Sequence, residues 1–85
     1  MANITSIDMY STSWCSDCYR ARSYFIKNKI SFNEIDIEKS PEALAAVEKM
    51  NNGLQSVPTI VITYSNQPEK ILTEPSISDL EEALN

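Results

Sequence analysis

The chain has 85 residues and a formal net charge of −5 at pH 7, and 42% of its residues are hydrophobic while 22% are charged. This composition is typical of a soluble globular protein, and the length predicts a single domain over residues 1–85. The acidic balance argues against nucleic-acid binding, which depends on Lys and Arg. No run approaches the ~20 apolar residues of a membrane span. Residues 1–5 lack the basic and apolar regions of a signal peptide, so we expect a cytoplasmic protein in a compartment that keeps thiols reduced.

The apolar pattern and the turn residues predict a series of strands and helices. In chain order they are a strand over residues 4–10, a helix over 16–28, a strand over 31–37, a helix over 43–50, a strand over 57–64, a short strand over 69–73 and a helix over 76–84. One apolar stripe is expected to bury the first helix against the core: Ala21, Tyr24, Phe25 and Ile26. Ile35 and Ile37 are expected to share one side of the second strand.

Polar and small residues mark the ends of the two later helices. Ser40 is a suitable N-cap, and Pro41 is a suitable first residue, for the helix that runs to residue 50. Gly53 suits a left-handed residue after the C-terminus of that helix. Ser76, with Asp79 three residues later, predicts a capping arrangement at the last helix.

The order of these elements indicates the fold class. The β-branched run over 57–64 predicts a central strand covered on both faces, which forms a hairpin with the strand over 69–73. The first strand–helix–strand unit predicts a parallel pair with a right-handed crossover. The expected fold class is therefore α/β, with the order β-α-β-α-β-β-α, a mixed four-stranded sheet and helices on both faces.

The only two cysteines, Cys15 and Cys18, lie at the predicted junction between the first strand and the first helix. Residues three apart on a helical turn face the same side, at a Cα separation of ~5–6 Å that suits a disulfide. The N-terminus of a helix stabilises an anion, because its N–H groups are unpaired and the helix dipole is positive there. We therefore predict that Cys15 is the nucleophilic thiolate and that Cys18 is the resolving thiol.

Two other interpretations of the cysteine pair are weaker. A zinc site needs four ligands, and the chain has no histidine and no third cysteine, so we expect no metal site. A structural disulfide would require an oxidising compartment and, in so small a chain, usually more cysteines. A redox-active pair is favoured, because the C-x-x-C motif follows a strand and precedes a helix.

Three segments together resemble the glutaredoxin family, which has the thioredoxin fold. They are YSTSWCSDC at 10–18, NGLQSVPT at 52–59 and EPS at 74–76, and the likeness extends over nearly the whole chain. C-x-x-C combined with a downstream Val-Pro-Thr is specific, whereas either motif alone is common. The Ser-Trp-Cys that begins the motif and the Pro-Ser before the last helix resemble the sequences of the mycoredoxin-like bacterial subgroup.

The resemblance implies roles for several residues. Cys15 would attack mixed disulfides and Cys18 would resolve them, while Pro58 would be cis and would face the cysteines. Because a proline has no N–H, the Val57 backbone would be left to pair with a bound thiol or peptide. Trp14 is predicted to form a flat wall beside the reactive cysteine rather than to join the core. The other predicted contacts to substrate or thiol are Gln55, Ile77 and Ser78.

The chain departs from many glutaredoxins at the positions that hold glutathione. Pro75 and Ser76 stand where many relatives have a Gly-Gly pair, and the residues at 11–13 lack the basic side chain that often precedes the cysteines. The middle of the motif is Ser16-Asp17, where Pro and Tyr or Gly are common. The resemblance implies glutathione or another low-molecular-weight thiol as co-substrate, with no tightly bound cofactor.

Three functions are compatible with these features. The first is a monomeric thiol–disulfide oxidoreductase that acts on disulfide-containing proteins and mixed disulfides and is recharged by a small thiol and its reductase. The second is a donor recharged by thioredoxin reductase, serving a protein such as ribonucleotide reductase. The third is an iron–sulfur cluster-binding module, against which Cys18 counts because such proteins often have one active cysteine.

Overall fold

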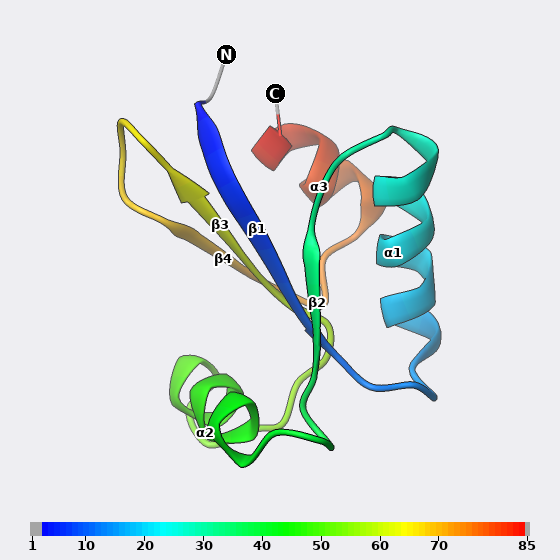
Figure 1. Cartoon of the computed structure of the whole chain (residues 1–85), viewed down its shortest axis with the longest axis vertical. Coiled ribbons are helices and arrows are strands. Elements are labelled where there is room, and N and C mark those ends of the chain that lie inside the picture. The colour runs from blue at the N-terminus through cyan, green and yellow to red at the C-terminus, as the bar shows by residue number, and fades with distance from the viewer. Residues whose placement is uncertain (1–2, 85) are drawn as a thin grey trace.

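The computed structural model describes residues 3–84, and its elements follow the predicted order (Figure 1). In chain order they are β1 (Ile4–Ser11), α1 (Ser16–Lys27), β2 (Asn33–Asp36), α2 (Pro41–Met50), β3 (Thr59–Tyr64), β4 (Lys70–Thr73) and α3 (Ile77–Leu84). The predicted boundaries differ from these by a few residues at strand and helix ends, where hydrogen bonding in the sheet and the caps decides the last residue.

The four strands form one mixed sheet in the order β2-β1-β3-β4. β1 pairs in parallel with β2 and antiparallel with β3, and β3 pairs antiparallel with β4. The β-branched run therefore forms a central strand, as predicted. Tyr10, near the end of β1, is opposite Ile35 on one side and Thr59 on the other. The end of β1 thus meets the start of β3 at one edge of the molecule, and the cysteine segment begins there.

One face of the sheet carries the larger core, which α1 and α3 cover. Its buried members are Ile7, Met9, Ala21, Phe25, Ile60, Ile62, Tyr64, Leu80 and Ala83. Phe25 is at the centre, with its ring 5.0 Å from that of Phe32 and 6.1 Å from that of Tyr24. Ile26 was wrongly predicted to be buried with this stripe, since 64% of it is exposed. It follows Phe25 directly, and one helical step turns it about 100° away from the sheet.

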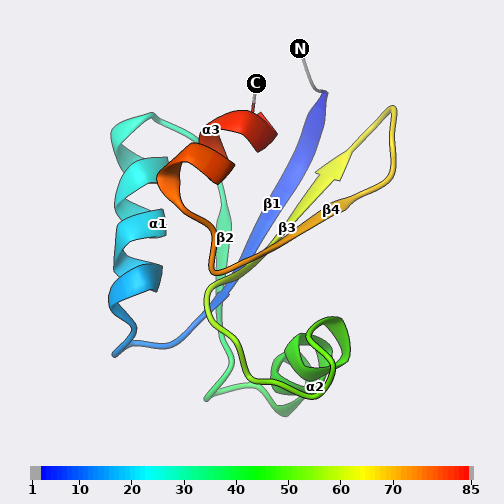
Figure 2. The ribbon, with the colours of Figure 1, turned by 180° about the vertical axis from the view of Figure 1, so that it is seen from behind.

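The other face carries a smaller core beneath α2. Its buried members are Ile37, Ala43 and Val47, and Tyr10, Ile35 and Val57 are among the residues that pack against them. The shared side of Ile35 and Ile37 is thereby confirmed. Figure 2 shows the separation from behind, with α1 and α3 together and α2 apart. Helices therefore cover both faces of the sheet, as predicted.

The predicted helix ends are confirmed. The Ser40 hydroxyl accepts the Ala43 N–H at 3.2 Å at the start of α2. Gly53 has a φ of 89°, and its N–H donates to the Glu48 carbonyl. Ser76 and Asp79 exchange side-chain-to-backbone hydrogen bonds at α3, each 3.1 Å long. Within residues 3–84, no helix has the length and apolar character needed to cross a membrane.

Candidate active site

Cys15 occupies the N-cap of α1. Its backbone is extended, with φ −86° and ψ 116°, and its sulfur accepts the Cys18 N–H at 3.1 Å. The sulfur therefore takes the place that a serine or aspartate oxygen usually has at a helix start. A negative charge on this atom would accept this helix N–H and would face the positive end of the helix dipole. The side chain is half-buried, so it also stays accessible from solvent.

Cys18 lies one turn along α1 and is fully buried. Burial raises the pKa of its thiol to about 12, and the hydrogen bond with the Cys15 sulfur acts in the same direction. A backbone hydrogen bond at Thr12 and the charge of Arg22 lower this pKa by smaller amounts. Both cysteines are free thiols. The pair therefore combines an accessible sulfur with a buried sulfur that is hydrogen-bonded to it.

The loop before β3 contacts Cys15. The Cys15 thiol donates to the Val57 carbonyl oxygen at 3.7 Å. The Val57–Pro58 bond is cis, as the resemblance implied, and Pro58 is buried. The Pro58 carbonyl accepts the Glu74 N–H at 2.8 Å, which connects this loop to the segment before α3. The cysteine segment therefore contacts the loop before β3, and that loop contacts the segment before α3.

The Asn51 side chain connects this loop to neighbouring elements by hydrogen bonds. Its amide donates to the Val47 carbonyl at 2.8 Å and to the Thr59 hydroxyl at 3.1 Å. Its side-chain oxygen accepts the Thr73 hydroxyl at 2.7 Å. Asn51 thus links α2, β3 and β4 in a largely buried network. This residue was not identified from the sequence, because a local pattern does not reveal partners up to 22 residues away.

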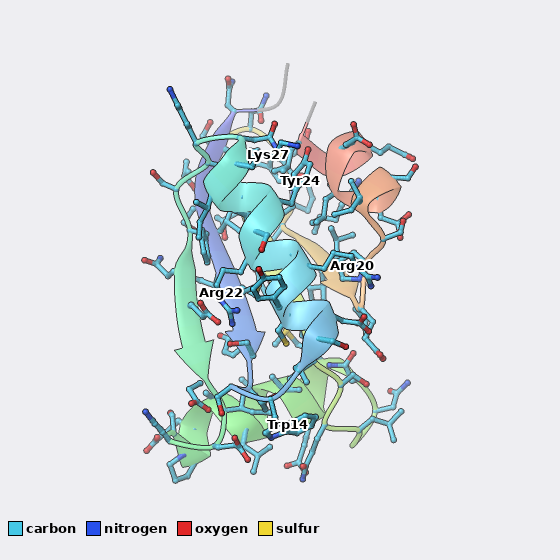
Figure 3. The ribbon with its side chains drawn as sticks, turned by 90° about the vertical axis from the view of Figure 1, so that its right-hand side faces the viewer. Trp14, Arg20, Arg22, Tyr24 and Lys27 are labelled. Carbon is cyan, nitrogen blue, oxygen red and sulfur yellow. The ribbon has the colours of Figure 1, made fainter. Side chains whose placement is uncertain are left out.

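A groove of about 590 Å³ runs beside Cys15. Its lining includes the predicted Trp14, Gln55 and Val57, and the full set is Trp14, Cys15, Ser16, Asp17, Leu54, Gln55, Ser56, Val57 and Glu74. Trp14 is 71% exposed, so it is a wall of the groove and not a core residue. Figure 3 shows its side chain beyond the first turn of α1, in front of α2 in that view.

Three predicted contact residues, Pro58, Ile77 and Ser78, lie outside this lining, and several residues that were not predicted as contacts, Glu74 among them, lie within it. Ile77 packs against the larger core and Ser78 is exposed on the first turn of α3. Glu74 lines the groove instead. Its backbone has a positive φ of 48°. The signal in the sequence was the Glu-Pro-Ser segment itself, whose first residue was used for the resemblance but not for the site.

A polar cluster flanks the Cys18 side of α1. The Arg22 guanidinium forms an ion pair with Glu34, whose carboxylate also accepts the Ser11 hydroxyl at 2.8 Å. The hydrogen bond with Glu34 raises the pKa of Arg22, and the hydrogen bond from Arg22 lowers the pKa of Glu34. Figure 3 shows Arg22 directed toward β2 and Arg20 directed to the other side of the helix. The two arginines therefore have separate partners, since Arg20 pairs with Asp17 at 2.8 Å.

The donors for a metal site are not assembled in the part of the chain that the structure describes. No group of three or more Cys, Asp or Glu side chains is placed to hold an ion among residues 3–84.

Comparison with known proteins gives a consistent result. Residues 7–65 match the model of the glutaredoxin family. Two Mycobacterium tuberculosis proteins named as glutaredoxins, MT3292 and Rv3198A, are each 32% identical to this chain over 79 residues, which is 93% of this chain and 89% of theirs.

Solved structures show the same fold. The thioredoxin-like protein BC3987 superposes with a TM-score of 0.75 at 21% identity, over 91% of this chain and 97% of that one. The glutaredoxin of Archaeoglobus fulgidus has a TM-score of 0.70 at 25% identity, over 100% of this chain and 88% of that one. The predicted thioredoxin fold is therefore confirmed.

Proposed function

The chain belongs to the glutaredoxin family, and from that premise we propose that it is a dithiol oxidoreductase that reduces protein disulfides and mixed disulfides with a low-molecular-weight thiol. The observation that carries this proposal is the asymmetry of the pair. The Cys15 sulfur is half-exposed at a helix N-cap in a groove, whereas Cys18 is buried directly behind it.

The reaction proceeds in two exchanges. The Cys15 thiolate attacks one sulfur of the substrate disulfide, that bond breaks, and the leaving sulfur takes up a proton. Cys18 then loses its proton and attacks the Cys15 sulfur, which closes the Cys15–Cys18 disulfide and releases the second substrate thiol. In total, the substrate disulfide gains two electrons and two protons from the protein dithiol. Two reduced small thiols, glutathione or another, return the protein to its dithiol form.

Local structure supports each step. The Cys18 N–H that donates to the Cys15 sulfur at 3.1 Å stabilises the attacking thiolate. Burial, the largest cause of the raised pKa of Cys18, keeps the resolving thiol protonated, and a mixed disulfide at Cys15 removes a smaller cause, the negative charge beside it. In our proposal the protein works as a cytoplasmic monomer, with a reductase that regenerates the small thiol.

The test compares variants and reductants. We expect Cys18→Ser to accumulate a mixed disulfide at Cys15, detected by mass spectrometry, and Cys15→Ser to accumulate none. Oxidised protein supplied with glutathione and glutathione reductase should consume NADPH. Turnover only with thioredoxin reductase would replace the proposal by the thioredoxin-like alternative. A visibly absorbing, iron-containing preparation would instead favour the cluster-binding module.

A further inference from the structure

The groove beside Cys15 is acidic. Its lining includes the acidic residues Asp17 and Glu74 and, among residues 3–84, no lysine or arginine. Asp17 is paired with Arg20, which lies outside the lining. The Glu74 side chain forms no ion pair or hydrogen bond with another described residue. A substrate in the groove therefore meets an uncompensated negative charge close to the reactive sulfur.

A smaller pocket of about 140 Å³ continues the groove past Val57. It shares Trp14, Gln55 and Val57 with the groove, and Ile37 and Leu44 give it apolar walls. The aliphatic walls and the flat indole suit a long side chain with an apolar stem.

The one charged residue that lines this pocket, among residues 3–84, is the acidic Glu38. Glu38 lines it, and one carboxylate oxygen accepts the Trp14 indole N–H at 3.3 Å. Thr12 also lines it, with a hydroxyl that is buried and has no hydrogen-bond partner in the described part of the chain. A cationic end group would find a carboxylate and the face of Trp14 there.

We propose that the groove and the pocket select disulfides in basic, extended protein segments over anionic disulfides such as that of glutathione. This inference rests on the proposed function, because it concerns the substrate of the same site. The segment lies along the Val57 backbone as an added strand, with its cysteine at Cys15 and a neighbouring lysine or arginine in the pocket beside Glu38. Glutathione carries more carboxylates than ammonium groups, so the Glu74 carboxylate repels it.

The reaction is the exchange already described, with a basic segment as the disulfide partner. The Cys15 thiolate forms a bond to the cysteine sulfur of the segment, the original disulfide breaks, and its other sulfur leaves as a thiol. Cys18 then displaces the reduced segment. The charges of the groove change the rate of the first encounter and leave the electron balance unchanged.

The experiment uses two peptides of equal length, each with one cysteine held in a neutral thiopyridyl disulfide. Two positions beside the cysteine are lysines in one peptide and glutamates in the other. Reduced protein is mixed with each peptide under single-turnover conditions, and release of the thiopyridyl group is followed by absorbance. We expect the basic peptide to react about 10-fold faster at low salt, since each exposed charge pair contributes up to about 5-fold. At about 500 mM salt the difference should fall to about 2-fold.

Variants that each remove one carboxylate charge show which residues cause the preference for the basic peptide. Glu74→Gln and Glu38→Gln should each reduce the ratio of the two rates by about 2- to 5-fold. The ratio removes any change in the intrinsic reactivity of Cys15, because both peptides meet the same sulfur. Glu69→Gln is the matched control, since it changes the net charge equally in the β3–β4 turn, at the far end of the molecule from α2 (Figure 1). Its ratio should equal that of the unmodified protein.

The results separate this inference from the proposed function. Equal rates for the two peptides, or equal losses in Glu69→Gln and Glu74→Gln, would overturn the charge selection while leaving the oxidoreductase intact. Release that persists unchanged in Cys15→Ser would instead overturn the proposed function. A preference seen with the small cationic disulfide cystamine but absent with the peptides would contradict a protein segment as the partner.

Discussion

The two sulfur atoms of the site are three residues apart in sequence, yet their surroundings differ sharply. Cys15 is half-exposed at the N-cap of α1, between a helix N–H and the Val57 carbonyl. Cys18 has no exposed surface and a thiol pKa of about 12. Cys15 is the last residue before α1. Cys18 belongs to the buried face of α1, together with Ala21 and Phe25. A single helical turn is thus enough to give the two cysteines of one motif very different exposure to solvent.

The largest expected effect is a difference in alkylation. In the reduced protein at pH 7 and 25 °C, Cys15 should react with iodoacetamide at least ~100-fold faster than Cys18, because reaction requires an accessible thiolate. Peptide mapping by mass spectrometry measures both rates in one sample. Comparable rates would show that the folded protein does not distinguish the two sulfurs.

The second effect concerns the loop before β3, which contacts Cys15 through Val57. Asn51→Ala removes the amide that donates to the Thr59 hydroxyl and leaves the Thr73 hydroxyl without its acceptor, so the free energy of unfolding should fall by about 1–3 kcal/mol. Urea denaturation measures this loss, and Asn66→Ala in the exposed β3–β4 turn should stay within about 0.5 kcal/mol of the unmodified protein. Cys18 should remain as unreactive as before, which would show that only the Cys15 environment depends on this loop.

The third effect is the alkaline response of Cys18. The folded pKa of about 12 exceeds the ordinary value of 9.0, so above pH 9 the unfolded chain binds fewer protons than the folded one. The corresponding stability is fully present below pH 9 and is lost as the pH rises toward 12. Between pH 9 and 10, the protein kept reduced by a phosphine should lose about 1 kcal/mol more than Cys18→Ala. Equal losses in urea titrations would contradict the burial of an uncharged thiol.

The smallest effect tests the polar cluster beside Cys18. The Arg22 hydrogen bond lowers the folded pKa of Glu34 below its ordinary 4.5, so this stability is present above that value and is lost as the pH falls through the folded pKa. Between pH 5 and 3, the protein should lose about 0.5 kcal/mol more than Glu34→Gln, as measured by urea denaturation. The alkylation rate of Cys15 should not change in this variant, since the cluster lies on the other cysteine's side. A changed rate would assign Glu34 a part in the chemistry.

Much of the fold could be predicted because its signals are local. Ser40 and Pro41 mark the start of α2, Gly53 marks its end, and the β-branched run of β3 indicates a central strand. Ile26 shows where this reasoning fails. Hydrophobicity alone did not reveal which side of α1 faces the sheet, and the angular position of each residue decides that once the helix packs.

The candidate site also has features that could be predicted from local sequence and features that could not. The C-x-x-C spacing and the strand–helix junction predicted that Cys15 and Cys18 share one helical turn, because that geometry depends only on neighbouring residues. The resemblance to the family added the cis bond at Pro58, which no local pattern indicates. Glu74 was found only in the structure, since 59 residues separate it from Cys15 in the chain.

By itself, the sequence determined the order of the elements, the caps and the position of the two cysteines on one helical turn, since each depends on contacts within a few residues. Only the tertiary structure decided that Cys18 is buried, that Val57 faces Cys15, and that Glu74 and Glu38 lie beside the groove. The physical reason is that burial and electrostatic potential arise from all the segments that meet at a point, and those segments are brought together only when the sheet forms.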